Sequence, residues 1–196
     1  MTKDVKWAID QAHSEITFKV KHLMIAHSNG TFKKFDANIY TANKDFETAE
    51  IDLWIDPTSI ITGDAKRDTH LKGSDFFDVE NHKQITFKSS TIGKNAKGGH
   101  ELWGELTIKG ITKPVKLEVQ FGGIAKDPYG HEKAGFTVTG VIKRSDWGLI
   151  WNAPTEAGGL MVSDEVAISC DVELVNVNQK ELAMELEPSA SKKIGF

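Results

Sequence analysis

The fold is decided by the stretch LWGELTIKGITKPVKLEVQF, residues 102–121. Every second position on its first half carries Leu102, Gly104, Leu106 or Ile108, and Val115, Leu117, Val119 and Phe121 repeat the spacing on the second half. Lysine or glutamate stands between most of them. This alternation is typical of strands with one buried face. Because glycine and proline in residues 110–114 favour a turn, the stretch predicts a β-hairpin.

Other segments of the chain repeat the alternation of apolar and polar residues. They span residues 15–22, 32–40, 51–55, 85–89, 136–142 and 166–174. Eight strands with one apolar face each predict an all-β protein, which is either a two-sheet sandwich or a barrel. Gly104 and Gly140 interrupt two apolar faces, and we interpret them either as leaving room inside a barrel or as marks of a bend or close backbone contact.

One connection differs in character from the rest, the stretch ITGDAKRDTHLKGSDFFD at residues 61–78. A long polar segment between strands indicates a lid or a mouth over the β structure. Asp64 is suited to cap a short helix over residues 65–72, which Gly73 would stop. Arg67 and His70 share a face of that helix. Phe76 and Phe77 would anchor the segment.

Composition excludes several classes of protein. The 24 basic and 28 acidic residues give a net charge of −4 without a long block of one sign, so nucleic acid is not expected as a partner. A single cysteine, Cys170, rules out an intrachain disulfide. No apolar run has the length of a signal or an integral membrane segment, and we expect a cytoplasmic protein. We expect one barrel domain, residues 1–175, and a tail at residues 176–196 that is partly helical or disordered.

The chain has only two arginines, Arg67 and Arg144, and both precede aspartates closely. One interpretation places their guanidinium groups at a cavity mouth, where they would bind an anionic head group. The other pairs them with Asp68, Asp146 or Asp164, so that they hold the lid on the barrel. We favour the structural interpretation.

The sequence offers little apparatus for catalysis or for cofactors. The seven histidines are scattered without the paired spacing of zinc sites, and we expect no metal and no cofactor. Nucleophile elbows and phosphate-binding glycine loops are absent. Among the tryptophans, Trp147 and Trp151 in RSDWGLIWN are the candidates for binding rather than core residues.

Several motifs occur in a characteristic order: WAIDQAHSEITFKVKHL, NGTF, TGDAKRDTHLKGSDFFDV, ITFKSS, GELTIKGITKPVKLEV, KRSDWG and SDEVAIS. With them the chain resembles the YceI-like family of polyisoprenoid-binding, lipocalin-like proteins. The resemblance implies an eight-stranded antiparallel lipocalin-like β-barrel with a short helical lid around residues 63–73. It also implies a long apolar channel for a polyisoprenoid or other long-chain amphiphile.

The expected function is therefore non-enzymatic binding, transport or storage of an isoprenoid or fatty-acyl amphiphile. The expected ligand-binding residues are Phe18, Val20, His22, Leu53, Arg67, His70, Phe76, Phe77, Phe87, Gly104, Leu106, Val138, Gly140 and Trp147. One alternative is an enzyme that acts on an amphiphilic isoprenoid with His22 or His70 and Asp68 as an acid–base pair. Another is a stress-associated interaction protein with the barrel as scaffold. A homodimer is compatible with each of these.

Overall fold

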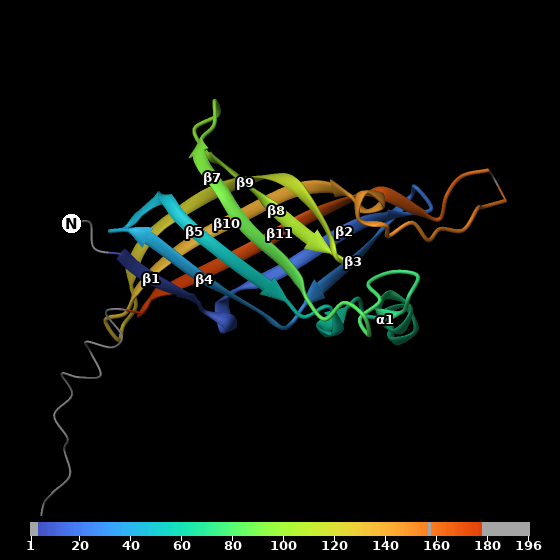
Figure 1. Cartoon of the computed structure of the whole chain (residues 1–196), viewed down its shortest axis with the longest axis horizontal. Coiled ribbons are helices and arrows are strands. Elements are labelled where there is room, and N and C mark those ends of the chain that lie inside the picture. Colours follow the sequence, from blue (N-terminus) through green and yellow to red (C-terminus); the bar gives the residue numbers. More distant parts are fainter. Residues whose placement is uncertain (1–3, 157, 178–196) are drawn as a thin grey trace, which may run out of the picture.

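The computed structural model describes residues 4–156 and 158–177, and antiparallel strands dominate it (Figure 1). The strands are β1 (Asp4–Ile9), β2 (Glu15–His22), β3 (Ala26–Phe32), β4 (Phe35–Ala42), β5 (Asp45–Ile55), β6 (Ile60–Ile61), β7 (Ile85–Lys94), β8 (His100–Ile108), β9 (Ile111–Lys126), β10 (Glu132–Lys143) and β11 (Val162–Asn176). The helical elements are η1 (Gln11–His13), η2 (Pro57–Ser59), α1 (Ala65–Lys72) and η3 (Arg144–Trp147). None of the described helices is long and apolar enough to cross a membrane.

The sheet closes on itself because β1 pairs with both β4 and β11. The ring runs β1-β4-β5-β7-β8-β9-β10-β11 and forms an eight-stranded antiparallel barrel, which confirms the predicted architecture. β2, β3 and β6 extend the sheet from the other part of β11. The ring therefore contains β1, which the alternation count had left out, whereas the predicted strand β2 lies beside the ring.

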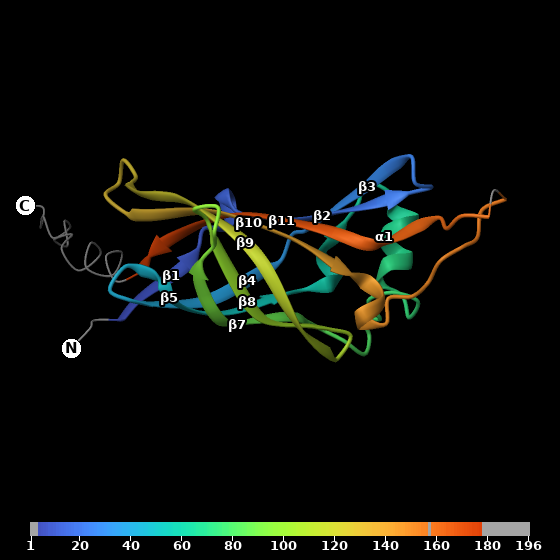
Figure 2. The same ribbon diagram turned by 90° about the horizontal axis from the view of Figure 1, so that it is seen from above.

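β1 and β2 lie in succession along the same edge of the long strand β11. Trp7 of β1 pairs with Asn176 near one end, and His22 of β2 pairs with Val162 near the other. η1 separates the two strands, and its cap residue Asp10 donates its backbone N–H to the carbonyl oxygen of Glu173 at 2.8 Å. This arrangement carries the wall beyond the ring, toward the end of the molecule where α1 lies (Figures 1 and 2).

The hairpin of β8 and β9 is tighter than the sequence indicates. Ile108 pairs with Ile111, so only Lys109 and Gly110 form the turn. Both residues have positive φ, 49° and 72°, which is the backbone of a two-residue hairpin turn. Residues 111–114, which we had assigned to the connection, belong to β9.

The predicted strand at residues 32–40 is divided in two. Phe32 ends β3 and Phe35 begins β4. β3 has few apolar residues, and Gly30 stands where it pairs with Phe18 of β2. A Cβ at Gly30 would lie 2.2 Å from Cζ of Phe18, so the ring of Phe18 occupies the space that a side chain on β3 would fill. The missing side chain explains why alternation did not reveal this strand.

The helical lid follows the predicted signals. The carboxylate of Asp64 caps α1 by accepting from the backbone N–H groups of Lys66 at 2.9 Å and Arg67 at 3.0 Å. Gly73 ends the helix with an N–H that donates to the carbonyl oxygen of His70. Figure 2 shows α1 at the same end of the barrel as the turn between β2 and β3. Most of the tail, from residue 178 onward, lies outside the described residues, so the domain limit at residue 175 stays a prediction.

Candidate functional site

The barrel encloses a cavity of about 920 Å³, and the alternating inner faces of the strands supply most of its lining. Its wall is chiefly aliphatic and aromatic, with residues such as Ile16, Leu53, Leu102 and Val166. Eight-stranded barrels have an interior that side chains can either fill or leave open for one small ligand. Here the interior stays open, which decides between the sandwich and barrel alternatives in favour of a hollow barrel.

Most of the predicted binding residues come together on this lining. Those that line the cavity are Phe18, Val20, His22, Leu53, Arg67, His70, Phe76, Phe77, Phe87, Leu106 and Val138. The structure therefore brings residues from β2, the lid segment and several ring strands around one space. Their contact with a ligand stays a prediction.

Gly104 and Gly140 do not create this space, and they are absent from the residues lining it. A Cβ at Gly104 would lie 2.4 Å from Cζ of Phe87 and 2.4 Å from the carbonyl oxygen of Lys88. At Gly140 a Cβ would lie 2.5 Å from Cδ2 of Leu117. Neighbouring side chains thus cover both glycines, and the interpretation as close-contact positions is the correct one.

Of the two candidate tryptophans, only Trp151 lines the cavity. Trp147 is buried in η3, and its Nε1–H donates to the carbonyl oxygen of Leu106 at 3.0 Å. Trp147 therefore supports the wall from outside the space. The Trp151 ring packs at 4.7 Å from the His70 ring and 5.6 Å from the Phe76 ring, measured between centroids.

The end where α1 and the loop around Leu149 and Trp151 line the cavity is called the lid end below. α1 is attached there through Thr62. The hydroxyl of Thr62 donates to Oδ1 of Asp68 at 2.6 Å and accepts from Nε–H of Arg67 at 2.8 Å. A second guanidinium N–H of Arg67 donates to the carbonyl oxygen of Thr62 at 2.8 Å. Arg67 and Asp68 thus hold the lid through a shared threonine, and the expected ion pair between them is not formed.

Arg144 holds the loop of the lid end through backbone carbonyls instead of the expected ion pairs with Asp146 or Asp164. Its buried guanidinium donates to the carbonyl oxygens of Leu149 at 2.5 Å, Trp151 at 2.9 Å and Ser163 at 2.9 Å. Asp164 binds the backbone N–H and hydroxyl of Ser145. Burial lowers the pKa of Arg144, and the nearby charge of Asp164 opposes that shift.

Charge is distributed unevenly along the cavity lining. Lys66, Arg67 and Arg144 line the lid end without a carboxylate. At the opposite end the lining lysines Lys44 and Lys94 are balanced by Asp45 and Glu47, the only lining carboxylates among the described residues. There Glu47 lies 3.3 Å from Nζ of Lys94 and 3.4 Å from Nε2 of His100, and these hydrogen bonds lower its pKa. The lid end is therefore the cationic end of the cavity.

The opposite end, called the aromatic end below, has a group of rings that the sequence did not single out. The Phe46 ring lies 4.8 Å from that of Phe136, 5.7 Å from that of Phe121 and 4.9 Å from that of Trp7. Phe121 and Phe136 stack at 5.1 Å. Each of these aromatic side chains stands on a different strand of the closed barrel. The only signal in the sequence is four aromatic residues on four separate strands, and the pairing that unites them is not visible in one sequence.

The acid–base pair considered for an enzyme is not formed. Asp68 accepts from Thr62, while Nε2 of His70 lies 3.0 Å from Oδ2 of Asp75. His22 lines the cavity from β2. The two histidines therefore face the cavity without the expected aspartate.

Similarity to known proteins agrees with this geometry. The model of the YceI-like domain family matches residues 7–174, nearly the whole barrel. The chain belongs to the YceI-like family. A UPF0312 protein of Staphylococcus epidermidis is 37% identical over 169 residues, which are 86% of this chain and 96% of the relative.

Solved structures of YceI proteins superimpose on the barrel. The YCEI protein of Campylobacter jejuni is 34% identical, with 85% of this chain and 95% of that chain covered and a TM-score of 0.68. A polyisoprenoid binding domain from Saccharophagus degradans covers 87% of this chain and 98% of its own at a TM-score of 0.62. At 16% identity, this second likeness shows the fold alone.

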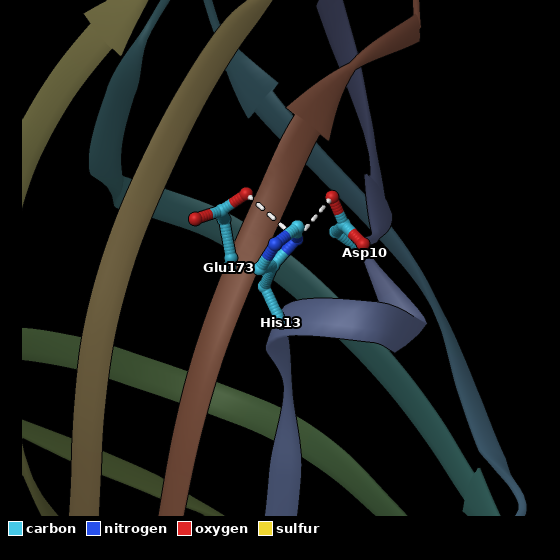
Figure 3. A group of neighbouring side chains, drawn as sticks. All are labelled: Asp10, His13 and Glu173. Carbon is cyan, nitrogen blue, oxygen red and sulfur yellow. Dashed lines mark hydrogen bonds and ion pairs between the residues drawn. The ribbon is translucent and has the colours of Figure 1, made fainter. Parts of the chain in front are cut away.

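Outside the YceI-type cavity, Asp10, His13 and Glu173 gather where β1 passes into β2 (Figure 3). His13 Nδ1 lies 3.1 Å from Asp10 Oδ2 and 3.6 Å from Glu173 Oε1. The ammonium group of Lys133 donates to both carboxylates as well. Its hydrogen bond lowers the pKa of Asp10. Because Lys133 already binds both Asp10 and Glu173, we interpret the group as an ion-pair network, and not as a metal site. This network joins η1 to β10 and β11.

Cys170 faces the cavity from β11. Burial raises the pKa of its thiol to about 12, and the charge of Asp171 adds to the shift. The thiolate is the reactive form of cysteine, and this shift disfavours the thiolate at neutral pH. Cys170 belongs to the apolar lining.

Proposed function

We propose that the protein binds and carries a polyisoprenoid or another long-chain amphiphilic lipid inside the barrel. The cavity of about 920 Å³ is the observation that supports this proposal most directly. It lies toward the upper end of the roughly 300–1,000 Å³ typical of small-molecule sites. Its chiefly hydrocarbon wall suits a hydrocarbon ligand, because a polar ligand would lose its hydrogen bonds with water there.

The lining provides enough binding energy for a chain without specific polar contacts. Each methylene transferred from water to the cavity contributes roughly 0.8 kcal/mol, so an acyl or isoprenoid chain gains affinity with its length. The cationic side chains of Lys66 and Arg67 lie at the lid end, where the described lining has no carboxylate. The ligand in this proposal therefore places its hydrocarbon toward the aromatic end and a polar or anionic head toward α1.

The structural comparison supports the class of ligand. The Saccharophagus domain with the same fold is described as polyisoprenoid binding. A shared barrel does not by itself carry a shared ligand, since one fold hosts different functions. What supports a similar ligand here is the open apolar interior of this chain.

The test is the lipid content of the protein purified from cells without detergent. Native mass spectrometry should show a mass excess that organic extraction removes, and the extract should contain a long-chain lipid. Val138→Trp places an indole in the cavity and should abolish the excess. Val141→Trp is the matched control, because Val141 lies on the same strand with 62% of its side chain exposed. A wild-type protein without lipid, or equal loss in both variants, would contradict the proposal.

A further inference from the structure

The turn between β2 and β3 exposes three consecutive apolar side chains. Leu23 is 40% exposed, Met24 61% and Ile25 87%, and these residues are called the hairpin tip. Leu160, 56% exposed, lies in the neighbouring loop, where the N–H of Leu23 donates to the carbonyl oxygen of Met161 at 2.8 Å. Single exposed apolar residues need no explanation, but a contiguous group indicates a surface that contacts a membrane or another protein.

The backbone of the hairpin tip does not account for these residues. Leu23 and Met24 have positive φ, 53° and 61°, and the N–H of Ile25 donates to the carbonyl oxygen of His22. A β-turn whose two central residues both have positive φ favours Asn-Gly, because glycine and asparagine adopt positive φ at low cost. Leucine and methionine make the turn less stable than Asn-Gly would, so the stability of the turn does not explain why these residues stand there.

The hairpin tip adjoins the wall of the cavity at the lid end. His22, immediately before the tip, lines the cavity, and so do Val162, which pairs with His22 at the start of β11, and the preceding residue Met161. Figure 2 shows the β2–β3 turn, α1 and the loop before β11 gathered at this one end. The exposed apolar side chains are thus next to the apolar interior, and a hydrocarbon chain could pass between them with little exposure to water.

The hairpin that carries the tip is basic, although the whole chain is acidic. The hairpin, residues 15–32, contains two lysines, Lys19 and Lys21, and one carboxylate, Glu15, which pairs with Lys33 at 3.8 Å, while the net charge of the chain is −4. Lys19 and Lys21 are exposed, and no ion pair is found for either within the described residues. The neighbouring loop contributes Glu156, and Asp164 is bonded to Ser145. Unpaired lysines behind an apolar tip match the charge of anionic lipid head groups.

We propose that the hairpin tip docks the lid end on an anionic lipid bilayer, so that the ligand passes directly between membrane and cavity. The proposal rests on the lipid-carrier function proposed above. Leu23, Met24, Ile25 and Leu160 enter the interface, and Lys19 and Lys21 contact lipid phosphates. A second copy of the chain is a poorer occupant, because four side chains do not supply the roughly 1,200 Å² that a stable protein interface buries.

The decisive variant replaces the tip with the residues that its backbone prefers, Leu23→Asn with Met24→Gly. Co-flotation with vesicles of phosphatidylcholine and phosphatidylglycerol should fall by about tenfold or more, since the inserted apolar area is removed. The thermal midpoint of unfolding should stay equal or rise, because the turn is relieved of strain. Tyr129→Ser, at an 85% exposed residue in the turn between β9 and β10, is the control and should leave flotation unchanged.

The electrostatic part is tested with Lys19→Gln and Lys21→Gln. Each should weaken binding to vesicles containing phosphatidylglycerol by about fivefold and leave binding to pure phosphatidylcholine unchanged. Equal flotation of wild type and tip variant would overturn the proposal. So would a wild-type dimer in sedimentation that the tip variant abolishes, because the tip would then be a contact between copies.

Lipid content separates this proposal from the carrier function. Native mass spectrometry of the tip variant should show the same bound lipid as the wild type, while transfer of that lipid to vesicles becomes slower. If both proteins carry lipid and transfer it equally fast, docking fails and the carrier function stands. If neither carries lipid, the carrier function fails, and docking for ligand exchange fails with it.

Discussion

The two ends of the cavity are closed in different ways. At the aromatic end, Trp7, Phe46, Phe121 and Phe136 meet ring against ring, and each side chain stands on a strand of the closed barrel. At the lid end, a short helix and a loop outside the barrel strands border the interior, and polar side chains hold them in place. Opening the aromatic end requires separating barrel strands, whereas opening the lid end requires breaking a few side-chain bonds. The lid end is therefore the expected route for ligand.

The largest effect is expected from the buried arginine of the lid end. Arg144→Ala leaves one buried and two partly buried carbonyl oxygens without this donor and should lower the free energy of unfolding by about 3 kcal/mol or more. Urea unfolding measures the loss. Arg67→Ala, at the exposed arginine bonded to Thr62, should cost less than about 1 kcal/mol. Equal losses in the two variants would mean that the loop does not depend on the buried guanidinium.

A somewhat smaller loss is expected at the aromatic end. Phe46→Ala removes the ring that contacts three others and should cost about 2–3 kcal/mol, because the side chain is only partly buried. It should also speed the release of a fluorescent fatty acid by opening a second exit. Phe46→Leu keeps most of the volume and should cost less than about 1.5 kcal/mol. An unchanged release rate in Phe46→Ala would show that the rings do not close this end.

The lid itself should respond locally. Thr62→Val removes the hydroxyl shared by Arg67 and Asp68 and should destabilise the lid by about 1 kcal/mol while global stability changes little. Hydrogen exchange should become faster in residues 62–79 and stay the same in β7–β11. Thr107→Val, which removes an exposed hydroxyl contact with Thr112, is the control. Uniform acceleration across the barrel would contradict a separately opening lid.

The smallest effect concerns pH and lies where β1 passes into β2. The hydrogen bond from Lys133 lowers the folded-state pKa of Asp10 below its unfolded value of about 3.9. The stability contributed by Asp10 is therefore complete above that value and is lost as the pH falls below it. Asp10→Asn keeps the helix cap and should cost about 1 kcal/mol at neutral pH. The difference between wild type and variant should shrink in acid urea titrations, and a constant difference would exclude the ion-pair explanation.

Local signals in the sequence predicted much of the fold. The alternation in residues 102–121 gave β8 and β9, and the cap at Asp64 with the stop at Gly73 gave α1, because neighbouring residues determine such features. β3 was not predicted, because the ring of Phe18 takes the place of a side chain at Gly30 and the strand therefore lacks the alternation of apolar and polar residues. A contact of the same kind decides between the two interpretations of Gly104, and the sequence does not show it because the Phe87 ring that covers this glycine comes from the neighbouring strand β7.

The polar contacts were less predictable than the strands. Arg67 and Asp68 were expected to pair, yet both bind Thr62. The position of Thr62 beside the helix depends on the path of the chain between β6 and α1. Arg144 binds backbone carbonyls, and every residue supplies a carbonyl, so no residue type marks them in the sequence. The aromatic end likewise unites residues from β1, β5, β9 and β10, which only barrel closure brings together.

The pairing of Trp7 with Asn176 joins the first described strand to the last. Until β11 has been synthesised, β1 has no partner along that edge and the interior is an open trough. Contacts between such distant residues form late and slow the folding of β proteins. A nascent chain would therefore expose the hydrocarbon surface of the future cavity throughout translation, and under the proposed carrier function a lipid enters only after synthesis of the barrel is complete.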